Sequence, residues 1–192
     1  MMIDEGVIAR GEPHWTVSPD YAQRLHIPQT LTGILQARLD SLARDEKIVL
    51  QRSSIIGRRF WDDAVAQLGE PVSPGGDQGA RADVWEPLQA LQSKELIHKQ
   101  RDSAFADADE YMFKHALLRD VTYETVLLRL RRVYHAQAAA WLEAHAGERL
   151  VEYLTLIAEH YALAGEKEKA ANYSRRVGEE KYKVSAFREA LA

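Results

Sequence analysis

The chain has 192 residues, of which 46% are hydrophobic and 28% are charged, a composition typical of a folded globular protein. It contains no cysteine, which excludes disulfide bonds, cysteine-ligated zinc sites and thiol catalysis. The formal net charge of −4 argues against general binding to nucleic acid or to a membrane surface. Because no apolar run is long enough to span a bilayer or to form a signal-peptide core, we expect a soluble cytoplasmic protein.

The first thirty residues contain a hairpin pattern followed by an irregular connector. Within residues 5–17, "GVIA" and "HWTV" read as two short strands on either side of a "RGEP" turn. The two ends of the sequence read as cut ends, because "VSAFREALA" stops in the middle of a helical pattern. We therefore expect an excised piece of a longer chain.

The next segment, up to about residue 96, has the apolar spacing of consecutive amphipathic helices. These helices are "TGILQARLDSL" from residue 32, "DEKIVLQRSSIIG", "FWDDAVAQLG" and, after a loop rich in proline and glycine at 70–81, "ADVWEPLQALQSKEL". In the second helix, Asp45 is the expected N-cap and Gly57 the expected C-terminal stop. Pro87 fits the first turn of the fourth helix.

Two segments with strand-like alternation follow. "LIHKQ" and "EYMFKH" flank the polar loop "RDSAFADAD", and alternation places Tyr111, Phe113 and His115 on one face of the second strand. Helices followed by a single hairpin with a polar tip are typical of a winged helix. We therefore expect a winged-helix domain over residues 31–116.

The rest of the sequence is helical. Residues 117–148 predict connecting helices, either two or one bent helix, that end at Gly147, and residues 149–192 predict a helical hairpin across Gly165. The hairpin carries small and aromatic residues in the order of a tetratricopeptide unit, namely Ala158, Tyr161, Gly165 and Ala170. Where that unit has its next aromatic residue stands Ser174, with Tyr173 one position early. A plain helical hairpin is the alternative, since any two packed helices need small residues where they cross.

No catalytic motif is present in the sequence. It lacks a phosphate-binding G-x-x-x-x-G-K-[ST] loop, a G-x-G-x-x-G fingerprint, an H-E-x-x-H zinc motif and a G-x-S-x-G elbow, and its seven histidines are scattered. The acidic groups Asp62–Asp63 and Asp107/Asp109/Glu110 have the chemistry for a divalent cation, but solvated surface charge is the favoured interpretation. We expect no enzymatic activity and no metal site.

A winged helix that binds DNA presents a positive surface on its third helix and wing. Residues 82–112 carry seven acidic and only three basic residues. The helix "ADVWEPLQALQSKEL", which would be the DNA-recognition helix, also offers residues with the character of a core, namely Trp85, Leu88 and Leu91. A winged helix that binds protein is therefore favoured, and a DNA-binding transcriptional regulator with a helical tail is the alternative.

Basic residues are concentrated further along the chain. Residues 114–135 hold five basic and two acidic residues. Arg129, Arg131 and Arg132 are either a solvated helix face that pairs with nearby acids, or a surface that meets an acidic neighbouring domain or a phosphate.

Three longer stretches resemble a known family. "IPQTLTGILQARLDSLARDEKIVLQRSSIIGRRF" resembles the segment that follows the ATPase core in bacterial regulatory ATPases of the STAND class. "YMFKHALLRDVTYETVLLRLRRVYHAQAAAWLE" resembles the exit from their winged helix, and "AEHYALAGEKEKAANYSRRVGE" resembles their first tetratricopeptide-like repeat. Such chains often carry an adenylate or guanylate cyclase, a LuxR-type DNA-binding domain or a protein kinase at one end.

The resemblance implies a non-catalytic regulatory fragment that couples the nucleotide state of a signal-transduction ATPase to a protein partner. Residues 1–30 would be the end of the ATPase lid with its connector. ATP or ADP would bind to the parent chain, and this fragment would hold no cofactor. Its partners would be the neighbouring ATPase domain and a protein bound by helical repeats beginning at residues 149–192, with no nucleic acid and no membrane.

His115 takes a specific role from the same resemblance. In the related NB-ARC ATPases the winged helix ends in a Met-His-Asp signature, whose histidine reaches the β-phosphate of bound ADP. "KHALL" places His115 at that position, with Lys114 for the methionine and Ala116 for the aspartate. The resemblance implies a phosphate sensor at a helix N-terminus, where backbone amides favour anions. Alternatively, His115 caps the helix or packs beside Phe113.

Overall fold

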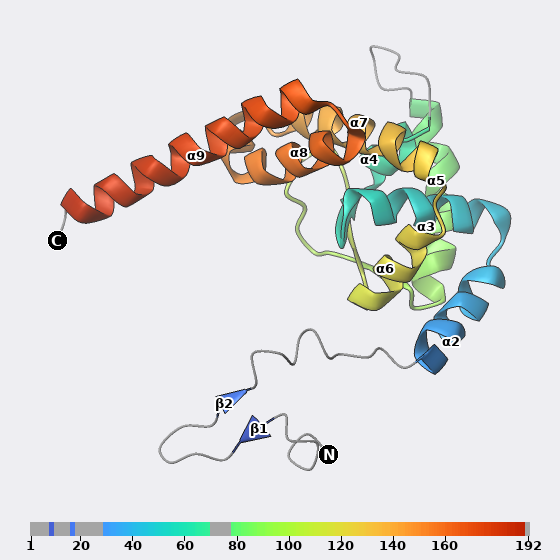
Figure 1. Ribbon diagram of the computed structural model, residues 1–192. Helices are drawn as coiled ribbons and strands as arrows, with labels where there is room; N and C mark the ends of the chain where they lie inside the picture. The colour runs from blue at the N-terminus through green and yellow to red at the C-terminus, as the bar shows by residue number, and fades with distance from the viewer. Residues whose placement is uncertain (1–7, 10–15, 18–28, 70–77, 191–192) are drawn as a thin grey trace. The chain divides into compact units, whose positions relative to one another are not determined.

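The computed structural model describes residues 8–9, 16–17, 29–69 and 78–190, with side chains for 31–69 and 83–183. The chain divides into two compact units, residues 1–37 and 38–192 (Figure 1). In the first unit, strand β1 (Ile8–Ala9) pairs antiparallel with β2 (Thr16–Val17). The predicted hairpin is thereby confirmed, and the connector after it lies outside the described residues. Helix α2 (Gln29–Asp40) begins three residues before its predicted start.

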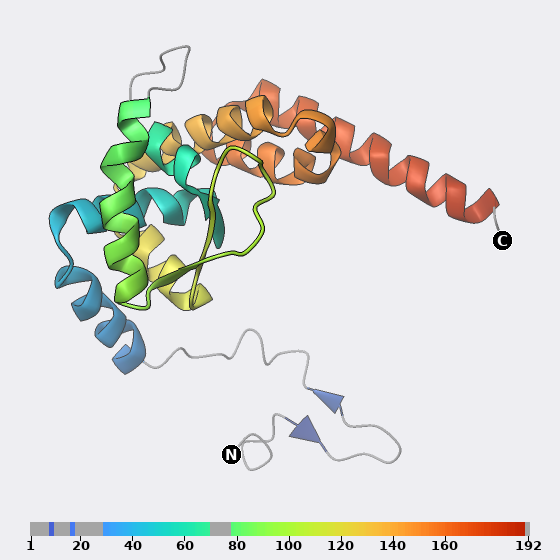
Figure 2. The ribbon, with the colours of Figure 1, turned by 180° about the vertical axis from the view of Figure 1, so that it is seen from behind.

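The described chain is mainly helical and contains a small three-stranded antiparallel sheet, which confirms the prediction of a mainly α fold with a β-hairpin. The sheet has the order β3 (Arg59–Trp61), β5 (Glu110–Phe113), β4 (Ile97–Lys99). The connection between β4 and β5 is a long open loop, which Figure 2 shows from behind.

Strand β3 was wrongly predicted to be the start of a helix. Helix α4 begins only at Asp62 and ends at Gln67. Phe60 and Trp61 are instead buried in extended backbone, where Phe60 pairs with Tyr111 across the sheet. The Phe60 ring stacks on Tyr111 at 5.8 Å and meets the edge of Phe113 at 5.4 Å. Aromatic cross-strand pairing therefore overrides the helical pattern of "FWDDAVAQLG".

Helix α3 (Arg44–Ile56) begins one residue before the predicted N-cap. Ala43 holds the N-cap position, and its N–H donates to the Glu46 carboxylate at 3.1 Å. Asp45 lies in the first turn, where its negative charge interacts favourably with the positive end of the helix dipole. Gly57 ends the helix as predicted, and its N–H donates to the Ser53 carbonyl.

Helix α5 (Gln78–Ser93) begins inside the segment that was predicted to be a loop. Pro87 consequently lies inside the helix and not in its first turn. Leu88 and Leu91 are buried as predicted, but Trp85 is 54% exposed, so its assignment to the core is wrong. Val84, Leu88 and Leu91 share one face of the helix, and Trp85 is turned about 100° away from Val84.

Of the two alternatives predicted for residues 117–148, two helices or one bent helix, the structure has two, α6 (Ala116–Glu124) and α7 (Leu128–His145). A short 3-10 turn (Gly147–Arg149) leads to α8 (Leu150–Ala164) and α9 (Lys167–Ala190). Helices α7, α8 and α9 pack side by side. The sheet is joined to α7 by aromatic contact, because the rings of Trp61 and Trp141 stack at 5.4 Å.

Helices α8 and α9 form the predicted hairpin across Gly165, whose φ of 88° is in the left-handed region. Tyr173, one position before the expected aromatic, is buried and stacks on Tyr161 at 5.8 Å, whereas Ser174, at the expected position, is exposed. Both tyrosine hydroxyls donate to the carboxylate of Glu143 on α7. One acidic side chain therefore connects all three helices.

Candidate functional site

His115 lies at the corner where β5 gives way to α6. Its backbone is extended, with φ −130° and ψ 135°, and it holds the N-cap position of α6. Its side chain is exposed and makes no capping hydrogen bond, whereas Tyr111 and Phe113 are buried as the alternation predicts. The strand ends at Phe113, so the alternation does not carry His115 into the core. Contact with a phosphate stays a prediction.

The three arginines of the basic segment have different environments. The Arg131 guanidinium donates to the carbonyls of Val126 at 2.8 Å and Glu124 at 2.9 Å, and it lies 4.5 Å from the centre of the Tyr123 ring. It thus closes the turn between α6 and α7. Arg129 and Arg132 are exposed on α7 and make no side-chain hydrogen bond or ion pair with another described residue. A role for these two in an interface stays a prediction.

Most members of the acidic groups are built into the packing of the sheet and its loop, whereas Asp107 is exposed. Glu110 is 4% exposed, lies 3.5 Å from an Arg59 nitrogen and accepts the Ala104 N–H at 3.1 Å. Asp62 accepts the N–H of Asp109 at 2.9 Å, and Asp63 accepts the indole N–H of Trp141 at 2.7 Å. Among the described residues no group of three or more His, Asp or Glu side chains has an arrangement that could hold a metal ion.

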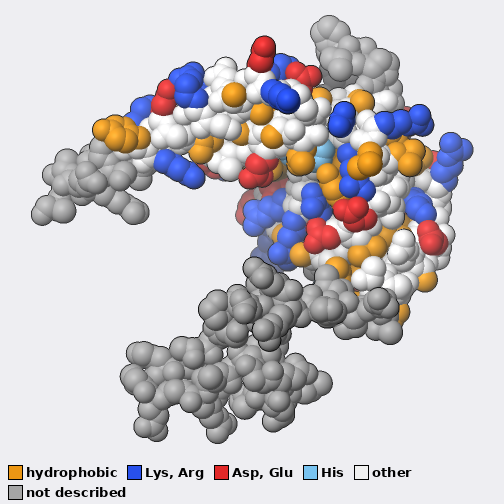
Figure 3. Space-filling model, viewed as in Figure 1, with side chains coloured by type: hydrophobic (Ala, Val, Ile, Leu, Met, Phe, Trp, Pro, Cys, Tyr) orange, Lys and Arg blue, Asp and Glu red, His pale blue; other side chains and the backbone are white. Residues whose placement is uncertain are grey.

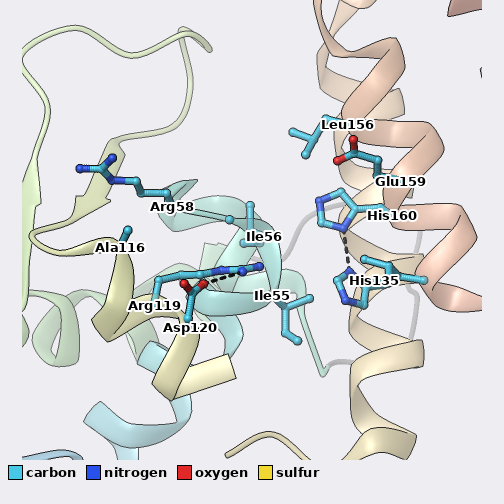
Figure 4. A pocket seen from close by; sticks show the side chains of 12 residues that line it. Ile55, Ile56, Arg58, Ala116, Arg119, Asp120, His135, Leu156, Glu159 and His160 are labelled. Carbon is cyan, nitrogen blue, oxygen red and sulfur yellow. Dashed lines mark hydrogen bonds and ion pairs between the residues drawn. The ribbon is translucent and has the colours of Figure 1, made fainter. Parts of the chain in front are cut away.

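A pocket of about 240 Å³ lies between the end of α3, the start of α6, and helices α7 and α8 (Figure 4). Its wall is partly apolar, from Ile55, Ile56 and Leu156 among others, and partly charged. At its α7–α8 side lie two histidines, His135 and His160, which the sequence analysis did not single out. Concave sites with apolar walls and a few convergent polar groups are the usual form of ligand sites in proteins.

The two histidines belong to a chain of hydrogen bonds that runs through three helices. The Tyr123 hydroxyl on α6 lies 3.0 Å from Nε2 of His135 on α7, and Nδ1 of His135 lies 2.8 Å from Nδ1 of His160 on α8. Both histidines are buried, with 1% and 3% of their surface exposed. Nε2 of His160, at the pocket end of the chain, has no hydrogen-bond partner within the described residues.

The charges around Tyr123 determine which atom donates and which accepts in each of these hydrogen bonds. The guanidinium groups of Arg119 and Arg131 lie 4.8 and 4.5 Å from the centre of its ring. Positive charge beside a phenol makes its hydroxyl a better donor, so we assign the Tyr123 proton to the bond with His135 Nε2. His135 then donates from Nδ1 to Nδ1 of His160. The remaining proton of the neutral His160 ring is then on Nε2.

Both rings are uncharged near neutral pH. Burial, followed by the charges of His160, Arg119 and Arg131, lowers the pKa of His135 to about 3. Burial lowers the pKa of His160 to about 4, and the contact of the ring with the Ile56 backbone acts in the opposite direction. A neutral imidazole has one donor and one acceptor, as the chain of bonds requires.

No family model, curated protein or solved structure matches this chain. None of the described helices is long and apolar enough to cross a membrane.

Proposed function

We propose that this chain is a non-catalytic regulatory segment of a multidomain signal-transduction ATPase, of the kind fused to a cyclase or transcriptional-regulator domain. In this proposal a winged-helix domain responds to the nucleotide held by the ATPase, and tetratricopeptide-like helices bind a protein partner. The assignment to an ATPase comes from the family resemblance of the sequence. The observation that carries the proposal is the exposed corner at His115, from which α6 leaves the sheet.

The order of elements supports a winged helix. Helix α3, strand β3, helices α4 and α5, and the hairpin β4–β5 follow one another, and β3 completes the sheet beside β5. Winged-helix domains have this order, with the hairpin as the wing. The tight α8–α9 hairpin, in which the buried Tyr173 stacks on Tyr161 one position before the aromatic position of the unit, supports the tetratricopeptide-like assignment. On the face shown in Figure 3, acidic, basic and hydrophobic side chains are interspersed along helices α8 and α9.

The electrostatics of the corner support a phosphate contact for His115. The first turn of α6 contains no acidic residue, and no side chain caps its amides. The positive end of the helix dipole is therefore not neutralised by its own helix, and it would attract an anion held by a neighbouring domain. An exposed imidazole at the same corner would donate a hydrogen bond to that anion.

The proposal is tested on the natural full-length protein. We expect a nucleotide-binding module upstream of residue 1 and, in that protein, several-fold faster release of fluorescent ADP after His115→Ala. His98→Ala is the matched control, because His98 is also an exposed histidine and lies on β4, the strand that pairs with β5. Unchanged ADP release in His115→Ala would leave the histidine a structural residue. A natural protein without such a module would contradict the ATPase assignment itself.

The DNA-binding alternative is tested separately with the 192-residue protein. Exposed acidic residues Asp83 and Glu86 lie on α5, the helix that would enter the major groove. We therefore expect no binding to duplex DNA at 50 mM salt. Binding whose affinity falls steeply with salt would favour the transcriptional regulator instead.

A further inference from the structure

The start of helix α7 presents aliphatic and basic side chains together on its surface. Leu127, Leu128 and Val133 are 57%, 75% and 50% exposed, and Arg129 and Arg132 are exposed among them. Residues three and four apart are neighbours on a helix, so the exposed side chains from 128 to 133 adjoin one another. On the face shown in Figure 3, hydrophobic and basic side chains gather over the start of α7. We call these five residues the α7 face.

The two arginines of the α7 face have no counterion within the described chain. Neither guanidinium makes a hydrogen bond or an ion pair with another described residue. Glu124, which ends the preceding helix, is bound by Arg131 at 3.0 Å, and Glu143, the only acidic residue of α7, accepts two tyrosine hydroxyls. The α7 face therefore carries two positive charges that the acidic residues of α6 and α7 nearest to it in the sequence do not balance.

The aliphatic side chains decide what kind of anion fits these charges. Leu128 and Val133 are about 140° apart around the helix, with both arginines between them. Exposed aliphatic side chains that gather at one place are characteristic of interaction sites, and arginine is enriched in protein interfaces. A free phosphate would engage the arginines but would leave the aliphatic side chains in water. The arrangement therefore fits a protein segment better than a phosphate.

We propose that the α7 face binds an acidic segment of a partner protein. Carboxylates of the segment accept hydrogen bonds from Arg129 and Arg132, and its apolar side chains cover Leu128 and Val133. Hydrogen bonds between a guanidinium and a carboxylate are charge-assisted, which makes them stronger than bonds between neutral groups. The surface lies on α7, outside the α8–α9 hairpin, and the inference does not depend on the proposed ATPase role.

The test is nitrogen-15 NMR of the backbone amides of the 192-residue protein, titrated at pH 7 and low salt. The probe is a synthetic acidic peptide in which glutamate and leucine repeat at helical spacing. The comparison probes are the same peptide with lysine for glutamate, the same peptide with serine for leucine, and inorganic pyrophosphate. We expect saturable shifts over residues 127–133 with the acidic peptide, at least tenfold weaker binding of each comparison probe, and weaker binding of the acidic peptide at high salt.

The titrations can contradict the proposal in two ways. An acidic peptide that produces no saturable shift, or shifts only outside residues 127–133, would overturn the site. Pyrophosphate, the serine peptide or the lysine peptide binding as tightly as the acidic peptide would overturn the class of partner.

A charge-reversed variant makes the test specific. Arg129→Glu/Arg132→Glu changes two exposed side chains, so it should fold normally and should bind the acidic peptide at least tenfold more weakly. The same variant should bind the lysine peptide, because the charges are then complementary again. Wild-type affinity of this variant for the acidic peptide would overturn the proposal.

The matched control is the double variant Arg58→Glu/Arg101→Glu. Both of these arginines are exposed, lie outside α7, and make no side-chain hydrogen bond or ion pair with another described residue. The control makes the same change in net charge, so it should bind the acidic peptide normally if the α7 face is the site. An equal loss of affinity in the two double variants would mean that binding depends on net charge alone, which would overturn the proposal.

Discussion

Nδ1 of His135 and Nδ1 of His160 lie 2.8 Å apart between α7 and α8, so one ring must donate and the other accept. Two protonated rings at this distance would repel each other. The pair therefore joins the two helices only while it is not doubly charged, which makes the stability of their contact dependent on pH.

The free energy of unfolding should fall as the solution is acidified below about pH 6.5. The pKa values of His135 and His160 in the folded protein, about 3 and about 4, lie below the ordinary value of about 6.5. Between the folded and unfolded pKa values the unfolded chain binds more protons than the folded chain. The contribution of these histidines to the free energy of unfolding is therefore fully present above the unfolded pKa and is lost as the pH falls towards the folded values. Each histidine contributes a slope of up to about 1.4 kcal/mol per pH unit. Urea unfolding at intervals from pH 7.5 to 4.5 measures it.

The control for this dependence is His98, which is exposed. His98→Ala should leave the slope unchanged, whereas His160→Asn should remove the contribution of one histidine. A slope that His160→Asn does not alter would show that other groups cause the acid sensitivity.

Arg131→Ala should destabilise the protein by about 1–3 kcal/mol, because it removes two hydrogen bonds to backbone carbonyls and the contact with Tyr123. The matched substitution Arg129→Ala should change stability by less than about 0.5 kcal/mol, since Arg129 is exposed on the same helix. Urea unfolding at pH 7.5 compares them. Equal effects would mean that Arg131 does not hold the α6–α7 turn.

Phe60→Ala should cost about 3–5 kcal/mol, because a fully buried ring leaves a cavity between Tyr111 and Phe113. Trp85→Ala should cost much less, since that ring is 54% exposed on α5. Thermal unfolding of the two variants distinguishes them. The reverse order would support the arrangement expected from the sequence, with Trp85 in the core.

Glu143→Gln should destabilise the α7–α9 packing by about 1–3 kcal/mol, because the hydroxyls of Tyr161 and Tyr173 would lose a charged acceptor. Burial raises the pKa of Glu143, but the two tyrosine hydrogen bonds outweigh it and hold the pKa below its usual value. The effect should therefore be full above about pH 5 and should shrink as wild-type Glu143 becomes protonated. Exposed Glu148→Gln is the control in the same urea titrations. Equal losses in both variants would argue against the shared acceptor.

Elements with strong local signals were predictable from the sequence. The hairpin of α8 and α9 follows from helical periodicity and from Gly165, which can adopt the left-handed backbone of the turn. The buried face of β5 follows from alternation, and the end of α3 follows from Gly57. Strand β3 was not predictable, because its pairing partners lie some fifty residues further along the chain.

Less of the candidate site could be predicted from the sequence. Nothing in "LRLRRVYH" separates Arg131 from its neighbours, since only the fold shows which arginine meets the free carbonyls at the end of α6. The histidine pair did leave a signal: His135 is spaced i, i+3, i+4 and i+7 with Ala138, Ala139 and Leu142, all of which are buried. A polar residue on an apolar helix face needs a partner, but His160 could be identified as that partner only after α7 and α8 were packed together.

The position of Tyr173 divides α9 into two parts with different local stability. Up to that residue, Ala170 and Tyr173 are buried, whereas no residue from 174 to 183 is buried. In hydrogen exchange, the first turns of α9 should belong to the same cooperative foldon as α7 and α8, and the later turns should open by local fraying. A protein partner that covers the outer turns would thus bring them into that foldon, so slowed amide exchange beyond Tyr173 would itself report that the partner is bound.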